Sequence, residues 1–188
     1  MLDRRRAVKR LLADRGAMLV VSGLGSATYD VAAAGDDARN FYLWGAMGGA
    51  VMIGLGLALA QPQRRVLVIT GDGEMLMGMG SLATVATQRP RNLAIVVLDN
   101  GAFGETGMQA SHTSGGVDLA AVAAGCGIPS TLEVTDEGGL DRLARLIHDA
   151  DAPLFARVRI TADEPPRVLP LRDGVALKLR FRAALGLS

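Results

Sequence analysis

The sequence predicts an α/β protein with a single doubly wound, mostly parallel sheet of about six strands and helices on both faces. Short continuous apolar runs, such as residues 66–69 and 93–98, lack the alternation of a half-exposed strand, as expected for strands covered on both faces. Such runs alternate along the chain with segments of helical pattern and length. Residues 1–188 are expected to form one domain, with 161–188 as a C-terminal extension.

The first half of the chain is divided into elements by glycine and proline. Residues 2–15 have the period of a helix, with Val8, Leu11 and Leu12 on one face and arginines on the other, and Gly16 ends it. The other expected elements are strands at 18–21 and 41–43, a helix at 28–34, a buried helix of small residues that ends at 60, a strand at 66–69, and one helix before Pro90.

The second half continues the alternation after the strand at 93–98. The polar segment 108–116 lacks a period and is a candidate lid or substrate loop. Asp118 is expected to cap the next helix, and Arg157 and Arg159 to be solvated at a strand end. The expected elements are a helix at 119–125, strands at 131–134 and 154–160, and helices at 138–150 and 175–185.

Composition argues against several classes of protein. A net charge of +1 does not favour nucleic-acid binding, which needs a clustered basic surface. The most apolar stretch, residues 46–60, is too short to span a membrane, and no signal peptide follows the N-terminal arginines. The single cysteine, Cys126, cannot form an internal disulfide and suits a reducing cytoplasm.

Polar turns follow two apolar strands that we expect to be neighbours. Gly71-Asp72-Gly73 ends the strand at 66–69, and Asn100 ends the strand at 93–98. The carboxyl edge of an open α/β sheet is where ligands bind, and the glycines allow the backbone to approach one closely. A helix start offers N–H groups to an anion, and Mg²⁺ is often shared between a carboxylate and phosphates. The pattern indicates a diphosphate–Mg²⁺ site.

Gly-Asp-Gly at one strand end and Asn100 at the next resembles the cofactor motif of thiamine diphosphate enzymes, over roughly residues 16–160. A dinucleotide fingerprint fits less well, because Leu76 stands where a third glycine is needed. The resemblance implies thiamine diphosphate and Mg²⁺ as cofactors. It implies Asp72, Asn100 and the Ala102 carbonyl as metal ligands, and as cofactor-binding residues Gly25, Ser26, Gly45, Ala46, Met47, Gly71, Asp72, Gly73, Glu74, Asn100, Ala102, Phe103 and Gly104.

Two residues are candidates for a direct part in the reaction. By resemblance, Met47 is the apolar wedge that bends the cofactor, although a methionine packed at a helix start is the alternative. His112 is a titratable side chain that could transfer a proton near the reactive carbon, and a surface histidine is equally compatible with its position. Gln109, Ser111 and Thr113 share this ambiguity.

The family's catalytic glutamate is missing from the motifs. Glu74 and Glu105 fall beside the diphosphate end, and Glu133, Glu137 and Glu164 lie outside the motifs. The resemblance therefore implies a partner, a pyrimidine-binding α subunit that carries the glutamate. The apolar segment 45–49 is expected to be covered by another chain, or by self-association when the partner is missing.

The chain is most similar in pattern to the small β subunits of split 2-oxoacid decarboxylases that act on sulfopyruvate or phosphonopyruvate. A decarboxylase (lyase) subunit that handles a small 2-oxoacid is thus the expected function. The alternatives are a β subunit of a 2-oxoacid oxidoreductase, a carboligase related to acetolactate synthase, or a non-catalytic cofactor-binding subunit. One cysteine cannot hold an iron–sulfur cluster, which weakens the oxidoreductase alternative.

Overall fold

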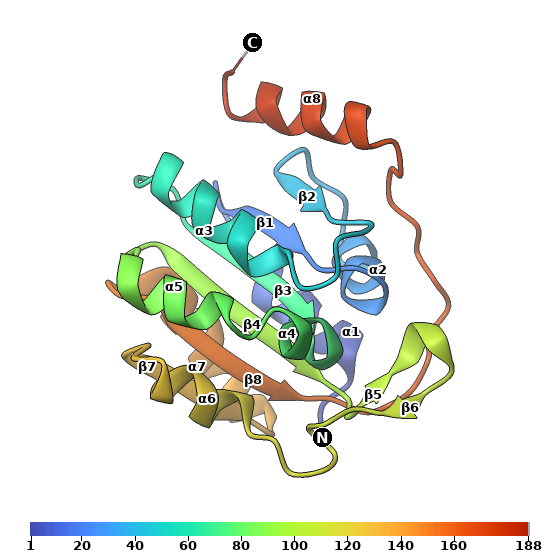
Figure 1. The fold of residues 1–188 in the computed structure, drawn as a ribbon. Helices are drawn as coiled ribbons and strands as arrows, with labels where there is room; N and C mark the ends of the chain where they lie inside the picture. Colours follow the sequence, from blue (N-terminus) through green and yellow to red (C-terminus); the bar gives the residue numbers. More distant parts are fainter. Residues whose placement is uncertain (188) are drawn as a thin grey trace.

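The computed structural model, which describes residues 1–187, has a six-stranded parallel sheet between two layers of helices (Figure 1). The strand order is β2-β1-β3-β4-β8-β7. The strands are β1 (Leu19–Ser22), β2 (Asn40–Tyr42), β3 (Val66–Gly71), β4 (Leu93–Asp99), β7 (Ser130–Val134) and β8 (Leu154–Arg159). The predicted fold class is confirmed.

Helices connect the strands and cover both faces of the sheet. They are α1 (Arg4–Leu12), α2 (Ser26–Ala33), α3 (Ala50–Ala60), α4 (Asp72–Met77), α5 (Ser81–Gln88), α6 (Leu119–Gly125), α7 (Glu137–Asp149) and α8 (Gly174–Ala184). Asp118 caps α6 as expected, because its side chain accepts hydrogen bonds from the N–H groups of Ala120 and Ala121.

The apolar runs of the central strands supply both cores. Leu67 and Ile69 of β3 pack on one face with residues of α1, α2 and α7. Val66 and Val68 pack on the other face with residues of α3, α4, α5 and α6. Successive side chains of a strand point to opposite faces, so a strand buried on both must be apolar throughout.

The strand order reverses between β1 and β3. β1 pairs with β2 on one side and with β3 on the other, and all of these pairings are parallel. The loops that leave the carboxyl ends of β1 and β3 therefore run in opposite directions and leave a crevice between them. In open α/β sheets, ligands bind in such a crevice.

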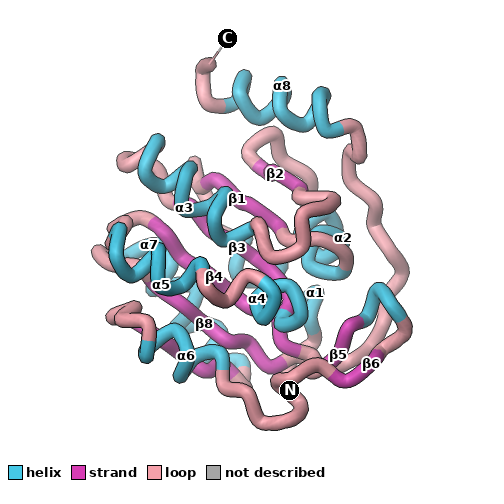
Figure 2. The backbone as a smooth tube through the Cα atoms, in the orientation of Figure 1, coloured by secondary structure: helices cyan, strands magenta, loops and turns pink. Residues whose placement is uncertain are grey.

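The expectation of one helix between the Gly-Asp-Gly turn and Pro90 is wrong. The structure has two helices, α4 and α5, separated by a turn at residues 78–80 (Figure 2). A Cβ built at Gly78 would lie 2.3 Å from the Gly48 carbonyl oxygen, so the backbones of these residues nearly touch. The turn lets the loop before α3 pack against the end of α4.

The polar segment after β4 contains regular structure. Residues Ala102–Phe103 (β5) and Gln109–Ala110 (β6) form an antiparallel hairpin, joined by a short 3-10 helix at Gly104–Thr106. Figure 1 shows this hairpin projecting beyond the carboxyl edge of the sheet. Beyond it, Ser111 and Thr113 are buried.

The C-terminal segment crosses the surface before α8. It leaves β8, passes the hairpin and ends in α8, which lies over β2 at the sheet edge (Figure 1). The Trp44 indole N–H donates to the Leu171 carbonyl at 2.9 Å, and Phe181 packs edge-on against Phe41. Within residues 1–187, no helix combines the length and the apolar character needed to cross a bilayer.

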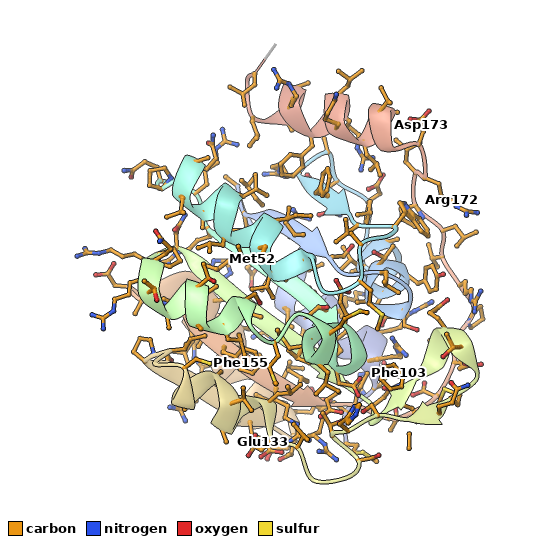
Figure 3. All side chains as sticks on the ribbon, viewed as in Figure 1. Met52, Phe103, Glu133, Phe155, Arg172 and Asp173 are labelled. Atoms are coloured by element: carbon orange, nitrogen blue, oxygen red, sulfur yellow. The ribbon has the colours of Figure 1, made fainter. Side chains whose placement is uncertain are left out.

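Two further expectations, both about helix faces, are wrong. Arg4 is expected on the solvent face of α1, yet it is buried because its Nε donates to Asp30 Oδ2 at 2.7 Å. The apolar helix α3 is expected to be buried, yet Met52 and Leu59 are 44% and 50% exposed. Figure 3 shows Met52 on the outer side of this helix.

Candidate functional site

A cavity of about 490 Å³ opens at the carboxyl edge of the sheet, beside the point where the strand order reverses. Its walls come from the loops after β1, β3 and β4, from the loop before α3, and from the segment after the hairpin. This volume is within the range of small-molecule and cofactor sites.

Most of the candidate residues line this cavity. Those that do are Ser26, Met47, Gly71, Asp72, Gly73, Glu74, Asn100, Ala102, Phe103, Gly104 and His112. Gly25, Gly45 and Ala46 belong to the same loops but do not line it. Further lining comes from residues that sequence reasoning did not single out, among them Arg4 and Ile160.

Asp72 lies at the wall of the cavity with its carboxylate buried. The Ser111 hydroxyl donates to Asp72 Oδ2, and Thr113 Oγ1 lies 3.2 Å from the same oxygen. Burial raises the pKa of Asp72, and the negative charge of Asp99 adds to the rise, whereas the hydroxyl hydrogen bonds oppose it. A cation in the cavity would stabilise the charged carboxylate.

The loop after β4 adds neutral oxygen atoms. Asn100 Oδ1 accepts the Ala102 N–H at 3.1 Å, which forms an Asx turn and places both residues on the cavity wall. Among residues 1–187, no group of three or more His, Cys, Asp and Glu side chains is placed to hold a metal ion. A metal here would therefore depend on one carboxylate, on neutral oxygens and on oxygens of the ligand, as Mg²⁺ often does.

Apolar side chains border the Gly-Asp-Gly turn. A Cβ built at Gly73 would lie 2.5 Å from the Phe103 ring and 3.6 Å from the Met47 ε-methyl group, so both side chains lie close to this turn. Phe103 lies beside α4 at the base of the hairpin (Figure 3). Met47 is 38% exposed, which leaves one side of it open to a ligand.

Glu74 lines the cavity but binds mainly to the protein. Its Oε2 accepts the Leu24 N–H at 2.9 Å. Burial raises the pKa of Glu74, and the hydrogen bond from the Leu24 N–H opposes that rise. The side chain joins α4 to the loop after β1 through Oε2, while its buried Oε1 has no hydrogen-bond partner within residues 1–187.

The close approach of Gly48 and Gly78 supports the loop that carries Met47. Gly78→Ala would place a methyl group against the Gly48 backbone, and we expect the free energy of unfolding to fall by about 1–3 kcal/mol. Gly80→Ala is the matched control, since its Cβ would meet no atom within 4 Å. Urea denaturation of both variants tests this, and equal stability would show that the loop adjusts freely.

His112 lines the cavity, and its side chain is exposed. Its carbonyl accepts the N–H groups of Gly115 and Val117, so the backbone is held while the imidazole remains free to face a ligand. The residues on either side, Ser111 and Thr113, point the other way and are buried.

The expectation that Arg157 is solvated is wrong. Arg157 is 4% exposed, and its Nε donates to Asp99 Oδ2 at 2.6 Å. Asp99, at the end of β4, is also buried and is 3.8 Å from Arg159, which is half-buried. The position of Arg157 inside the strand, between the apolar residues Ala156 and Val158, was the signal that could have indicated a buried ion pair.

Comparison with known proteins identifies the family. Residues 23–158 match the family model described as the thiamine pyrophosphate enzyme C-terminal TPP binding domain. The sulfopyruvate decarboxylase subunit beta of Methanothermobacter thermautotrophicus is 39% identical over 168 residues, which are 88% of this chain and 87% of that protein. Phosphonopyruvate decarboxylase of Streptomyces hygroscopicus is 42% identical over 89% of this chain, which spans 39% of that longer protein.

Solved structures agree on the fold. A putative thiamin diphosphate-dependent enzyme from Mycobacterium smegmatis has a TM-score of 0.72 and 23% identity, over 86% of this chain and 32% of that one. The fold and the family inferred from the Gly-Asp-Gly motif are thus confirmed. The chain belongs to the thiamine pyrophosphate enzymes, as a chain of their C-terminal cofactor-binding type, within the group that contains the sulfopyruvate decarboxylase β subunits.

Proposed function

We propose that this chain is the subunit that binds Mg²⁺ and the diphosphate of thiamine diphosphate in a two-subunit decarboxylase for a small anionic 2-oxoacid, such as sulfopyruvate or phosphonopyruvate. The supporting observation is that Asp72, Asn100 and Met47, which come from separate loops, surround one cavity. The names of the similar β subunits and of the longer phosphonopyruvate decarboxylase support the substrate class.

The chemistry of the donor set fits the cofactor. Asp72, Asn100 and the Ala102 carbonyl would hold Mg²⁺, and Gly25 and Ser26 would contact the terminal phosphate. The turn at Gly25 has a positive φ of 67°, which glycine adopts without strain. The loop at Gly45 and Ala46 would support the aminopyrimidine ring. When bound, thiamine diphosphate supplies the carbon nucleophile and the electron sink for loss of CO₂.

The apolar side chains near the metal site would shape the cofactor and exclude water. Met47 and Phe103 both lie close to Gly73, where they would hold the cofactor in a bent form. His112 would face the reacting carbon and move a proton at its imidazole, because the segment that carries it borders the same cavity.

A partner chain completes the proposal. Four methionines, Met47, Met52, Met77 and Met79, are 36% to 68% exposed and are called the methionine face here. Met47 and Met77 line the cavity, Met52 is on α3, and Met79 is in the turn between α4 and α5. Exposed apolar surface next to a site indicates contact with another chain. We assign it to a pyrimidine-binding α subunit with the catalytic glutamate, or to a second copy when that subunit is missing. Free Cys126 supports a cytoplasmic location.

Release of CO₂ by the co-purified complex tests this function. Sulfopyruvate, phosphonopyruvate and pyruvate are each supplied with Mg²⁺ and thiamine diphosphate, and we expect release from one of the first two. Release from none, with the cofactor shown to be bound, would contradict the proposal. Formation of acetolactate from pyruvate, or reduction of an electron acceptor, would support the carboligase or the oxidoreductase alternative.

Met47→Ala tests whether the Met47 side chain bends the cofactor. We expect kcat to fall by more than about tenfold, which is about 1.4 kcal/mol in the barrier, while the Kd of thiamine diphosphate stays within a few fold. The reason is that the metal and phosphate ligands lie elsewhere in the cavity. Leu179→Ala is the control, since Leu179 is exposed on α8 and lies outside both the cavity lining and the methionine face. Equal turnover in wild type and Met47→Ala would leave Met47 with a packing role only.

A further inference from the structure

The proposed metal ligand Asp72 is held by hydroxyl groups from a distant part of the chain. Ser111 and Thr113 both approach Asp72 Oδ2, and neither approaches Oδ1. The two hydroxyl oxygens are 2.9 Å apart, and both residues are buried. Asp72 Oδ2 therefore accepts from the Ser111 hydroxyl and is in contact with the Thr113 oxygen.

Thr113 is in turn fixed by a second carboxylate. Thr113 Oγ1 donates to Asp99 Oδ1 at 2.8 Å, a shorter separation than the 3.2 Å to Asp72. A threonine hydroxyl has one proton, so it donates to Asp99 while Ser111 donates to Asp72. Asp99 Oδ1 also accepts the Gly101 N–H at 2.9 Å, which ties this network to the loop after β4.

An arginine from β8 makes this arrangement possible. Two buried carboxylates would repel each other unless one of them were compensated. Arg157 donates to Asp99 Oδ2 at 2.6 Å, on the side away from Thr113, and its side chain is 5% exposed. Asp118 and Glu133 lie 3.7 and 3.8 Å from the same guanidinium and are half-exposed. The positive charge of Arg157 thus offsets Asp99 and leaves the charge of Asp72 available to a cation.

The segment 111–113 is anchored independently of the side chains. The Ser111 N–H donates to the Gly101 carbonyl at 2.8 Å, and the Ser114 N–H donates to the Ser111 carbonyl at 3.2 Å. The hydroxyls are therefore presented from a fixed backbone.

We propose that Ser111, Thr113, Asp99 and Arg157 are positioning residues, which orient the Asp72 carboxylate so that Oδ1 faces the metal. This inference rests on the proposed role of Asp72 as a metal ligand. These four residues come from three separate segments of the chain. None of them belongs to the Gly-Asp-Gly and Asn100 motif. The proposed role also predicts that changes in this network alter the choice and affinity of the metal more than they alter the fold.

Metal selectivity provides the test. Mg²⁺ requires near-octahedral geometry, whereas Ca²⁺ accepts flexible ligands, so a loosened carboxylate should penalise Mg²⁺ more. In Ser111→Ala, which removes the hydroxyl that donates to Asp72, calorimetry with thiamine diphosphate present should show a Kd for Mg²⁺ raised by about 10- to 100-fold, and a smaller rise for Ca²⁺. Thr113→Val, which acts through Asp99, should change the two Kd values in the same direction. Thr113→Ser keeps the hydroxyl and should restore wild-type values. The full chain is used with its partner subunit, and Arg157→Lys provides a second variant that keeps the charge.

The controls separate this inference from the proposed function. Ser114→Ala removes a hydrogen bond from the same segment without touching Asp72, and should leave the ratio of the two Kd values unchanged. If Asp72→Ala removes Mg²⁺ binding while Thr113→Val and Ser111→Ala keep both Kd values within twofold, the positioning role is refuted and the metal site stands. Equal losses for Mg²⁺ and Ca²⁺ in Thr113→Val and in Ser114→Ala would also refute it, as general damage to the segment. If Asp72→Ala binds Mg²⁺ normally, the proposed function itself fails.

Discussion

Asp72→Ala is expected to remove Mg²⁺-dependent binding of thiamine diphosphate. Asp72 lines the cavity with Asn100 and Ala102, so its loss would remove the anionic protein ligand of Mg²⁺ and leave the diphosphate charge uncompensated. We expect Kd to rise by more than about 100-fold, equivalent to about 2.7 kcal/mol. Calorimetric titration of the cofactor, with and without Mg²⁺, measures the effect.

The fold of Asp72→Ala should persist, since the substitution removes a buried charge that lies near the charge of Asp99. Asp136→Ala is the control, because it should lower stability without affecting cofactor binding. Asp136 is the N-cap of α7, and its side chain accepts the Gly139 N–H. Its loss should cost about 1 kcal/mol of unfolding free energy and leave the Kd of the cofactor unchanged. Cofactor affinity that is unaltered in Asp72→Ala would exclude this metal site.

The second expected result is that the purified chain is inactive alone and becomes active with a pyrimidine-binding subunit. Two glutamates line the cavity: Glu74 accepts the Leu24 N–H through Oε2, and Glu105 lies 3.6 Å from Arg167. Both closely follow a proposed metal ligand in the chain, so both would lie at the diphosphate end of the cofactor. Glu133, Glu137 and Glu164 do not line it. The purified chain alone and the chain combined with the pyrimidine-binding subunit are compared for CO₂ release and for deuterium exchange at the C2 position of thiamine diphosphate.

The methionine face supplies the matched variants for this experiment. Met77→Glu places a charge on a side chain that is 68% exposed beside the cavity, and should weaken assembly and activity together. Leu179→Glu places the same charge on α8, where Leu179 is 57% exposed and does not line the cavity, and should leave assembly intact. Rapid C2 exchange in the chain alone would contradict the two-subunit proposal and require a base within it.

The elements of the sheet could be predicted because local signals determine them. The apolar runs of β3 and β4 are buried on both faces, and Asn100 forms a turn with its own neighbour Ala102. Strand character and turn chemistry depend on residues a few positions apart, which a single sequence displays. Since parallel strands share one carboxyl edge, the meeting of Asp72 and Asn100 at one cavity followed from these signals.

The surroundings of Asp72 depended on contacts that no local pattern reveals. Ser111 is 39 positions from Asp72, and Arg157 is 58 positions from Asp99. From sequence alone, Ser111 and Thr113 were as compatible with a surface loop as with a site, and Arg157 was expected to be solvated. A polar side chain is stable in the interior only when the fold brings it a partner, so its burial and its role were decided by the tertiary structure.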